Sequence, residues 1–257
     1  MVRKTTSILL AHCILIANLY AQSSEVLLQE ALHYESNFKS KEALQRYEEI
    51  INSNPDHILA LVHASRILSV LGGHLQKEKR DEKLTYFNKS ETYAKQAITL
   101  EPTSKEARLA HIIALGMKSE ISRNPHEKVS DAQLIYNEAR AILKIDSLFP
   151  EAYFVLGKWQ LELSRLNWFE LLACKILGGG LPEEISTEAA LRYFTKAVTL
   201  RSESILFLFG QASAYSDLGE NNRARAILER ALRLPVSEPD DYLRKERCKE
   251  LLEKIKT

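Results

Sequence analysis

Apolar residues recur at helical spacing along most of the chain, in amphipathic stretches that end in similar six-residue segments. These segments occupy residues 50–55, 97–102, 142–147, 197–202 and 231–236. Each one closes an apolar stripe and is followed by the start of another. Their ends at 55, 102, 147, 202 and 236 lie 47, 45, 55 and 34 residues apart. Recurrence of this kind predicts an array of similar helical units.

The shortest spacing, 34 residues, is the period of the tetratricopeptide repeat, a pair of antiparallel helices. The other three units then carry 13, 11 and 21 inserted residues. A small residue followed by a large one precedes the segment end in units one, four and five: Ala43 and Tyr47, Ala190 and Phe194, Ala224 and Leu228. Units two and three match this pattern less well: the corresponding pair is Ser90 and Ala94 in unit two, and Ile135 and Ala139 in unit three. The pattern predicts an all-α, right-handed superhelical solenoid; a bundle of five unrelated helices is the alternative.

The last apolar stripe predicts a helix that caps the array over about residues 239–256. Pro239, Asp240 and Asp241 suit its first turn. One stripe is formed by Leu243, Cys248, Leu251, Leu252 and Ile255. We expect the charged opposite face to be solvated; it comprises Arg244, Lys245, Arg247, Lys249 and Lys254 with Glu246 and Glu250.

The first 21 residues have the parts of a secretory signal peptide. Arg3 and Lys4 precede a short apolar run over residues 7–19, and Ala21 offers a small residue at the break. We therefore predict cleavage after Ala21, a repeat domain over residues 22–257, and export to the periplasm or beyond, with no stable membrane span after cleavage. An uncleaved anchor and a buried first helix remain alternatives. Bacterial lipidation of Cys13 is disfavoured because His12, directly before it, is not small.

Composition excludes several classes of protein. Only 9 glycines and 7 prolines occur in 257 residues, too few for the turns of an all-β fold. The 35 basic and 34 acidic residues nearly cancel, which argues against general nucleic-acid binding. No catalytic motif and no spacing of histidines, cysteines or carboxylates typical of a metal site is found, so we predict no enzyme, no cofactor and no metal. Cys174 and Cys248 are expected to be buried thiols, with one disulfide bridge left open.

The fourth unit is the most distinctive part of the chain. Both tryptophans, Trp159 and Trp168, stand there nine residues apart, and the inserted residues 171–182 follow. The insertion is either a contact surface for a partner or a place where Trp168 and Phe169 seal an elongated helix against its neighbour. We expect the second, and a simple turn at Gly178–Gly180.

With these residues the chain resembles the regulator of microtubule dynamics family and its bacterial relatives. The resemblance rests on Leu156, Gly157 and Trp159, on the run Leu166, Asn167, Trp168, Phe169 and Glu170, on residues 178–181 and on residues 234–236. It covers roughly residues 26–255. It implies an α-helical scaffold without catalytic activity, whose eukaryotic members associate with microtubules or mitochondrial membranes. The predicted export signal departs from that pattern, so the tubulin partner is not expected to transfer.

Tetratricopeptide repeats bind extended peptides on the concave face formed by the first helix of each pair. The candidates for that face are Leu28 and Leu32, Leu109 and Ile113, Phe154 and Lys158, and Phe209 and Ser213. They are mostly apolar and lack the Lys/Asn/Arg set that clamps a C-terminal carboxylate. The first hypothesis is therefore a periplasmic protein-interaction scaffold. The second is a membrane-anchored or cytoskeleton-associated adaptor that keeps its N-terminal segment.

Overall fold

The structure is a computed structural model that describes residues 24–178 and 184–255. All regular structure in the described part is helical, which confirms the all-α prediction. A helix over residues 24–36 comes first. It is followed by α2 (Ser40–Ser53), α3 (Ile58–His74), α4 (Arg80–Leu100), α5 (Lys105–Ile121), α6 (Pro125–Ile145), α7 (Pro150–Ser164), α8 (Trp168–Gly178), α9 (Thr187–Leu200), α10 (Ile205–Asp217), α11 (Asn221–Arg233) and α12 (Asp241–Lys254). The predicted signal peptide, residues 1–21, lies outside the described residues.

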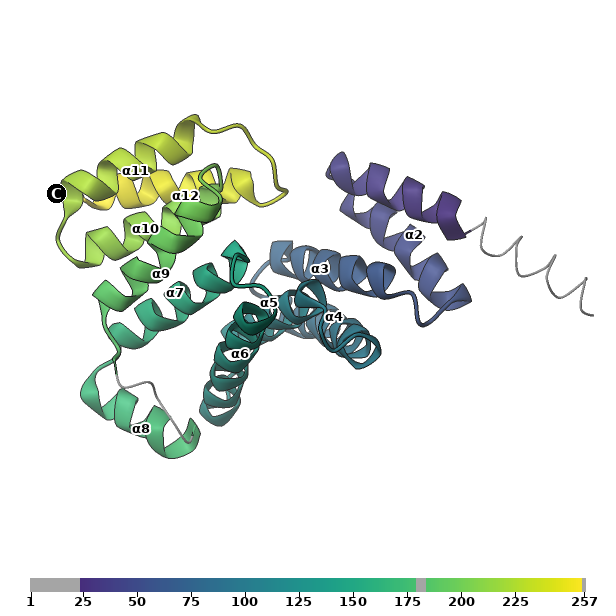
Figure 1. Ribbon diagram of the computed structural model, residues 1–257, viewed down its shortest axis with the longest axis horizontal. Helices are drawn as coiled ribbons and strands as arrows, with labels where there is room; N and C mark the ends of the chain where they lie inside the picture. The colour runs from purple at the N-terminus through teal and green to yellow at the C-terminus, as the bar shows by residue number, and fades with distance from the viewer. Residues whose placement is uncertain (1–23, 179–183, 256–257) are drawn as a thin grey trace, which may run out of the picture.

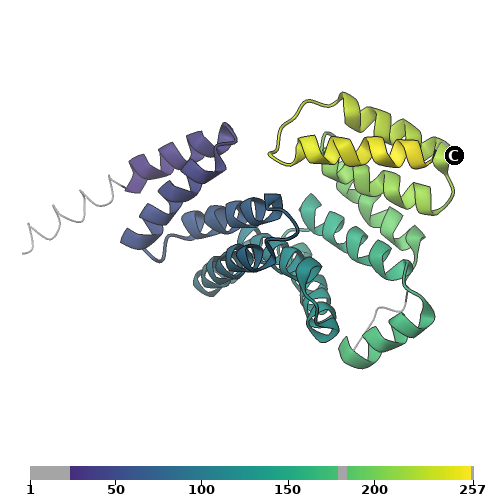
Figure 2. The ribbon, with the colours of Figure 1, turned by 180° about the vertical axis from the view of Figure 1, so that it is seen from behind.

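The helices form a solenoid of antiparallel pairs (Figures 1 and 2). The pairs are residues 24–36 with α2, α3 with α4, α5 with α6, α7 with α9, and α10 with α11, while α12 packs on the last pair. Each recurring six-residue segment marks the end of a second helix, at α2, α4, α6, α9 and α11. The repeat register derived from the sequence is therefore confirmed.

Small residues let the paired helices approach closely, as the register predicts. Ala43, Ala190 and Ala224 are fully buried, and so are their large partners Tyr47 and Leu228. The degenerate pair Ser90 and Ala94 is also buried. In unit two the Ser90 hydroxyl donates to the carbonyl oxygen of Ser65 at 2.7 Å, so a buried hydrogen bond joins α3 and α4 at the small-residue position. Phe87 on α4, almost fully buried, packs against Gly72 on α3.

The inserted residues have two different fates. In units two and three they lengthen both helices, to 17 residues in α3 and α5 and 21 residues in α4 and α6, against 13 in α10 and in α11. In unit four they form the separate helix α8, which packs on α6. The expectation of an elongated helix at this point is therefore wrong. The reason is a chain break after α7, since Arg165–Asn167 leave the helix before α8 begins at Trp168.

The array curls until its second helix pair meets the loop before the capping helix. The imidazole Nε2 of His74, at the end of α3, lies 2.7 Å from Oδ1 of Asp240, just before α12, across 166 residues of sequence. In Figure 1 the loop that leads into α12 accordingly lies beside the end of α3. The end of α3 and the loop before α12 thus meet at one side of the solenoid.

The predicted capping helix is present as Asp241–Lys254, so it begins two residues after the predicted start and leaves Pro239 and Asp240 before its first turn. It buries Cys248, and Ile255 directly after it is also buried. Two of the side-chain predictions for it are wrong. Leu243 is 50% exposed, whereas Arg244 is mostly buried and pairs with Glu238 and Asp241. Arg244 stands one helical turn before Cys248, so it shares the inward face, and Leu243 falls outside it. Its burial is tolerated because its guanidinium is ion-paired.

Both cysteines outside the N-terminal segment are free: Cys248 is buried and Cys174 is partly exposed. Among the described residues, no helix has the length and apolar character needed to cross a membrane.

Candidate partner-binding groove

The first helices of successive pairs line the inner face of the solenoid, where three neighbouring cavities adjoin. Their volumes are about 270, 560 and 510 Å³. Phe154 on α7 and Leu206 on α10 line all three, so the cavities belong to one surface. We call this surface the groove. It runs from the mouth beside α3, past α5 and α7, to α10 and α12.

Six of the concave-face candidates, those on α5, α7 and α10, line this groove. Leu109 and Ile113 lie at the first cavity, Ile113, Phe154 and Lys158 at the second. Phe154 and Lys158 continue into the third with Phe209 and Ser213. The structure therefore brings residues from three first helices together on one surface. Their role in binding a partner stays a prediction.

Leu28 and Leu32 do not belong to the groove. Leu28 is 9% exposed and packs in the core of the first pair, and Leu32 packs against the same core. No unit precedes this helix in the described part of the chain, so its apolar stripe is used against α2 and α3. Leu206 was not among the predicted groove residues. It stands in the first turn of α10, before the two predicted positions Phe209 and Ser213.

The floor of the groove is aromatic and rigid. The Phe154 ring lies 5.6 Å from the ring of Phe194 and 5.4 Å from that of Phe207, both almost fully buried. Gly116 on α5 lines the same floor, and a Cβ added there would meet no atom within 4 Å. The groove therefore has a fixed wall on α7 and open space beside α5.

Most charges around the groove are already paired. Arg201 binds Glu151 at 2.5 Å, and Lys158 lies 3.6 Å from Glu120. The Glu35 carboxylate accepts hydrogen bonds from Tyr47 Oη at 2.8 Å and from His63 Nδ1 at 2.6 Å. Burial alone raises the pKa of Glu35, but the hydrogen bond and charge of His63, the Tyr47 hydrogen bond and the charge of Arg66 together hold the pKa below its usual value. Paired charges over an apolar floor suit the binding of an apolar segment, not proton transfer.

Arg66 on α3 is the exception at the mouth of the groove. Its side chain is exposed and makes no hydrogen bond or ion pair in the described part of the chain, although Glu35 is near enough to interact electrostatically.

The distinctive residues of unit four have structural explanations where they are described. Gly157 on α7 and Gly210 on α10 both face the Phe194 ring, and an added Cβ would lie 2.8 and 2.7 Å from ring carbons. Only glycine permits so close an approach at these positions. Trp159 is 7% exposed, and its indole N–H donates to the carbonyl oxygen of Ala132 at 2.9 Å.

The run from Asn167 to Glu170 starts α8 with a capping box. The Glu170 N–H donates to Oδ1 of Asn167 at 3.0 Å, and the Asn167 N–H donates to Oε2 of Glu170 at 2.9 Å. This reciprocal pair satisfies two backbone donors at a helix start. The side chains of Trp168 and Phe169 lie outside the described residues, and so do Gly179 and Gly180. Their predicted roles stay predictions.

Within the described ranges, no group of three or more histidine, cysteine, aspartate or glutamate side chains is placed to hold a metal ion. The geometry offers a binding surface and a rigid scaffold that supports it.

Comparison with known proteins decides the family. The model of the family described as regulator of microtubule dynamics protein 1-3 matches residues 7–256. The chain belongs to this family. It is similar to regulator of microtubule dynamics protein 2 of Mus musculus, with 26% identity over 237 residues, 90% of this chain and 56% of that protein. It is also similar to protein 3 of Rattus norvegicus, with 26% identity over 238 residues, 86% of this chain and 47% of that protein.

This family member spans about half the length of the curated relatives it matches. Among solved structures, a thermophilic TPR protein of Thermus thermophilus matches with a TM-score of 0.63 and 14% identity, over 89% of this chain and 98% of that one. That likeness shows the fold and confirms the tetratricopeptide architecture.

Proposed function

We propose that the protein is a non-enzymatic scaffold that binds an extended, mainly apolar segment of a protein partner in the groove. The observation that carries the proposal is the joining of the three cavities at Phe154 and Leu206. A continuous surface with an aromatic floor and charged residues along it fits a chain segment better than a small molecule. The tetratricopeptide fold supports it, since such repeats present concave surfaces to partners.

The scaffold is further proposed to work after export, in the periplasm or outside the cell. The support is the basic start, short apolar run and small residue of the first 21 residues. The competing function is an adaptor that keeps this segment as an anchor and contacts microtubules, as the names of the relatives suggest for those proteins.

Two measurements separate these functions. Mass spectrometry of the protein from its host should show a chain that begins at Gln22, and fractionation should place it outside the cytoplasm. A chain that retains residues 1–21 and co-sediments with polymerised tubulin would replace the exported scaffold with the anchored adaptor.

The groove itself is tested by filling it. Gly116→Phe would place a ring in open space beside α5, whereas Gly116→Ala adds a single methyl group at the same place. Affinity capture from host extract should yield partners with the wild type and with Gly116→Ala that are lost with Gly116→Phe. Capture of the same partners by all three proteins would show that binding occurs elsewhere.

A further inference from the structure

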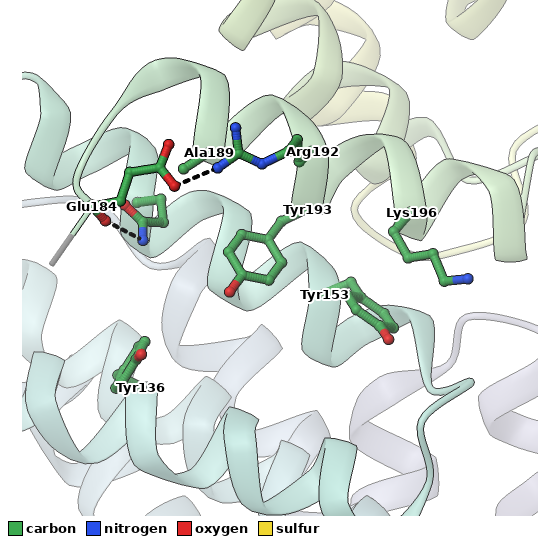
Figure 3. A pocket seen from close by; sticks show the side chains of 8 residues that line it. Tyr136, Tyr153, Glu184, Ala189, Arg192, Tyr193 and Lys196 are labelled. Atoms are coloured by element: carbon green, nitrogen blue, oxygen red, sulfur yellow. Dashed lines mark hydrogen bonds and ion pairs between the residues drawn. The ribbon is translucent and has the colours of Figure 1, made fainter. Parts of the chain in front are cut away.

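A pocket separate from the groove is built partly on α7, and Figure 3 shows it from close by. Its volume is about 430 Å³, and none of its lining residues lines any of the three groove cavities. Tyr153 and Gln160, seven residues apart on α7, form one side. Tyr136 comes from α6 and Tyr193 from α9, the second helices of units three and four. We call it the tyrosine pocket.

Two of its three tyrosine hydroxyls have no partner among the described residues. The Tyr153 hydroxyl donates to the carbonyl oxygen of Ser147 at 3.0 Å. The hydroxyls of Tyr136 and Tyr193 make no hydrogen bond within the described part of the chain. The Tyr153 and Tyr193 rings lie 6.5 Å apart, and in Figure 3 the Tyr193 ring points from α9 toward the side of the pocket that carries Tyr136. The walls thus offer aromatic faces together with hydroxyl donors.

The rim of the tyrosine pocket carries uncompensated positive charge. Arg192 pairs with Glu184 at 2.6 Å, and Glu188 also interacts with it. Lys196 on α9 has no ion pair among the described residues. Arg140 on α6 has none either within those ranges, and its guanidinium carbon stands 5.6 Å from the centre of the Tyr136 ring. Lys196 thus lines the pocket on α9, and Arg140 stands beside the Tyr136 wall on α6.

Gln160 provides an independent observation. Its side chain is 4% exposed, and its amide nitrogen donates to the carbonyl oxygen of Glu184 at 3.1 Å. That contact fixes the orientation of the amide, because a flipped oxygen would face the Glu184 carbonyl. The amide oxygen is buried and has no hydrogen-bond partner in the described structure. Buried acceptors are satisfied in most native structures, and this one has no donor among residues 24–178 and 184–255.

We propose that the tyrosine pocket binds an extended acidic peptide segment, at a site separate from the groove. A backbone N–H of the segment is a donor for the Gln160 amide oxygen. Carbonyl oxygens accept from the free tyrosine hydroxyls, a carboxylate pairs with Lys196, and apolar side-chain atoms cover the tyrosine rings. No single small anion presents all of these groups.

A nucleotide would satisfy part of the same chemistry, but the surroundings disfavour it. Glu184 and Glu188 stand at the start of α9, where the helix dipole would otherwise attract phosphate. These carboxylates repel the concentrated charge of a polyphosphate at the helix start, whereas the carboxylates of an extended segment are spread along its length and one of them can reach Lys196, two turns further along the helix.

The test uses a fluorescein-labelled hexapeptide of alternating aspartate and leucine and fluorescence anisotropy on the chain from residue 22. We expect saturable binding that Lys196→Glu weakens by about tenfold or more, because attraction becomes repulsion. Gln160→Met keeps the size of the side chain, removes the amide, and should weaken binding to a similar degree. Lys175→Glu on α8 is the matched control, since it makes the same charge change on an exposed side chain outside both sites. It should leave the affinity unchanged.

Several results would overturn the proposal. These are no saturation up to about 1 mM peptide, equal binding of a lysine–leucine hexapeptide, or full affinity in Lys196→Glu or Gln160→Met. Binding of ATP but not of the peptide, again dependent on Lys196, would make the pocket a nucleotide site instead. Gly116→Phe separates this proposal from the function of the groove. If filling the groove removes hexapeptide binding, the peptide occupied the groove and not the tyrosine pocket.

Discussion

Two glycines on neighbouring first helices offer a direct measurement of packing in this solenoid. Gly157 faces the ring of Phe194, and an alanine Cβ there would lie 2.8, 2.9 and 3.1 Å from three ring carbons. Comfortable carbon contacts are about 3.5–4.0 Å. The ring has no room to retreat, because it is 1% exposed and Gly210 approaches it equally closely. Gly116 is the matched control, since its added Cβ would meet nothing.

Both substitutions to alanine gain the same helix propensity, about 1 kcal/mol. Gly116→Ala should therefore stabilise the protein by about that amount. Gly157→Ala adds an overpacking cost of about 1–3 kcal/mol, which cancels or exceeds the gain. The difference between the two variants removes the shared propensity term and should equal the packing cost, about 1–3 kcal/mol.

Urea unfolding followed by circular dichroism measures both variants on the same scale. A third variant tests the cause: Phe194→Leu makes room for the methyl group, so Gly157→Ala should cost less in that background, with a coupling of at least about 0.5 kcal/mol. The reasoning is refuted if Gly157→Ala stabilises the wild type as much as Gly116→Ala does.

Three further predictions concern other parts of the solenoid. Ala224→Trp should destabilise the last pair by at least about 1–3 kcal/mol, because Ala224 is fully buried; an unchanged melting temperature would contradict this. Asp241→Asn should cost about 1.5–3 kcal/mol at pH 7. Burial alone raises the pKa of Asp241, but N–H donors and Arg244 lower it overall, so its contribution is lost as the pH falls below about 4, and an equal cost at about pH 3 would contradict the assignment. Trp168→Ala should cost about 3–5 kcal/mol if Trp168 is core, as we predict; in a Trp159→Phe background, red-shifted emission that iodide quenches readily would reverse that.

Local patterns made most of the fold predictable. The ends of five second helices follow from the six-residue segments, because each segment contains the last turn of its helix and the residues directly after it. These helices are α2, α4, α6, α9 and α11. Buried alanines such as Ala43 follow from a fixed offset to those ends. The groove residues on α7 could be placed because this helix keeps the repeat register, so Phe154 and Lys158 fall on the inner face.

Features that depend on distant parts of the chain could not be read from the sequence. Arginine is a residue type expected in solvent, yet the Arg244 side chain is mostly buried. Its ion pairs with Glu238 and Asp241 form only when the loop before α12 folds back. The unpaired oxygen of Gln160 depends on the path of Glu184, which lies beyond the insertion. The separate helix α8 had a local signal that was overlooked: Asn167 and Glu170 are spaced as a capping box.

The contact between His74 and Asp240 changes how local unfolding spreads between the units. In an open solenoid each unit senses only its neighbours, so fraying at one end reaches the other step by step. Here α3 and the approach to α12 are joined directly, across 166 residues, by one side-chain pair. From α3 to α12 the array therefore closes on itself, and a single exposed side-chain contact makes the closure. A partner that contacts both α3 and the loop before α12 would strengthen that closure and couple the second helix pair to the capping helix in a single cooperative unfolding step.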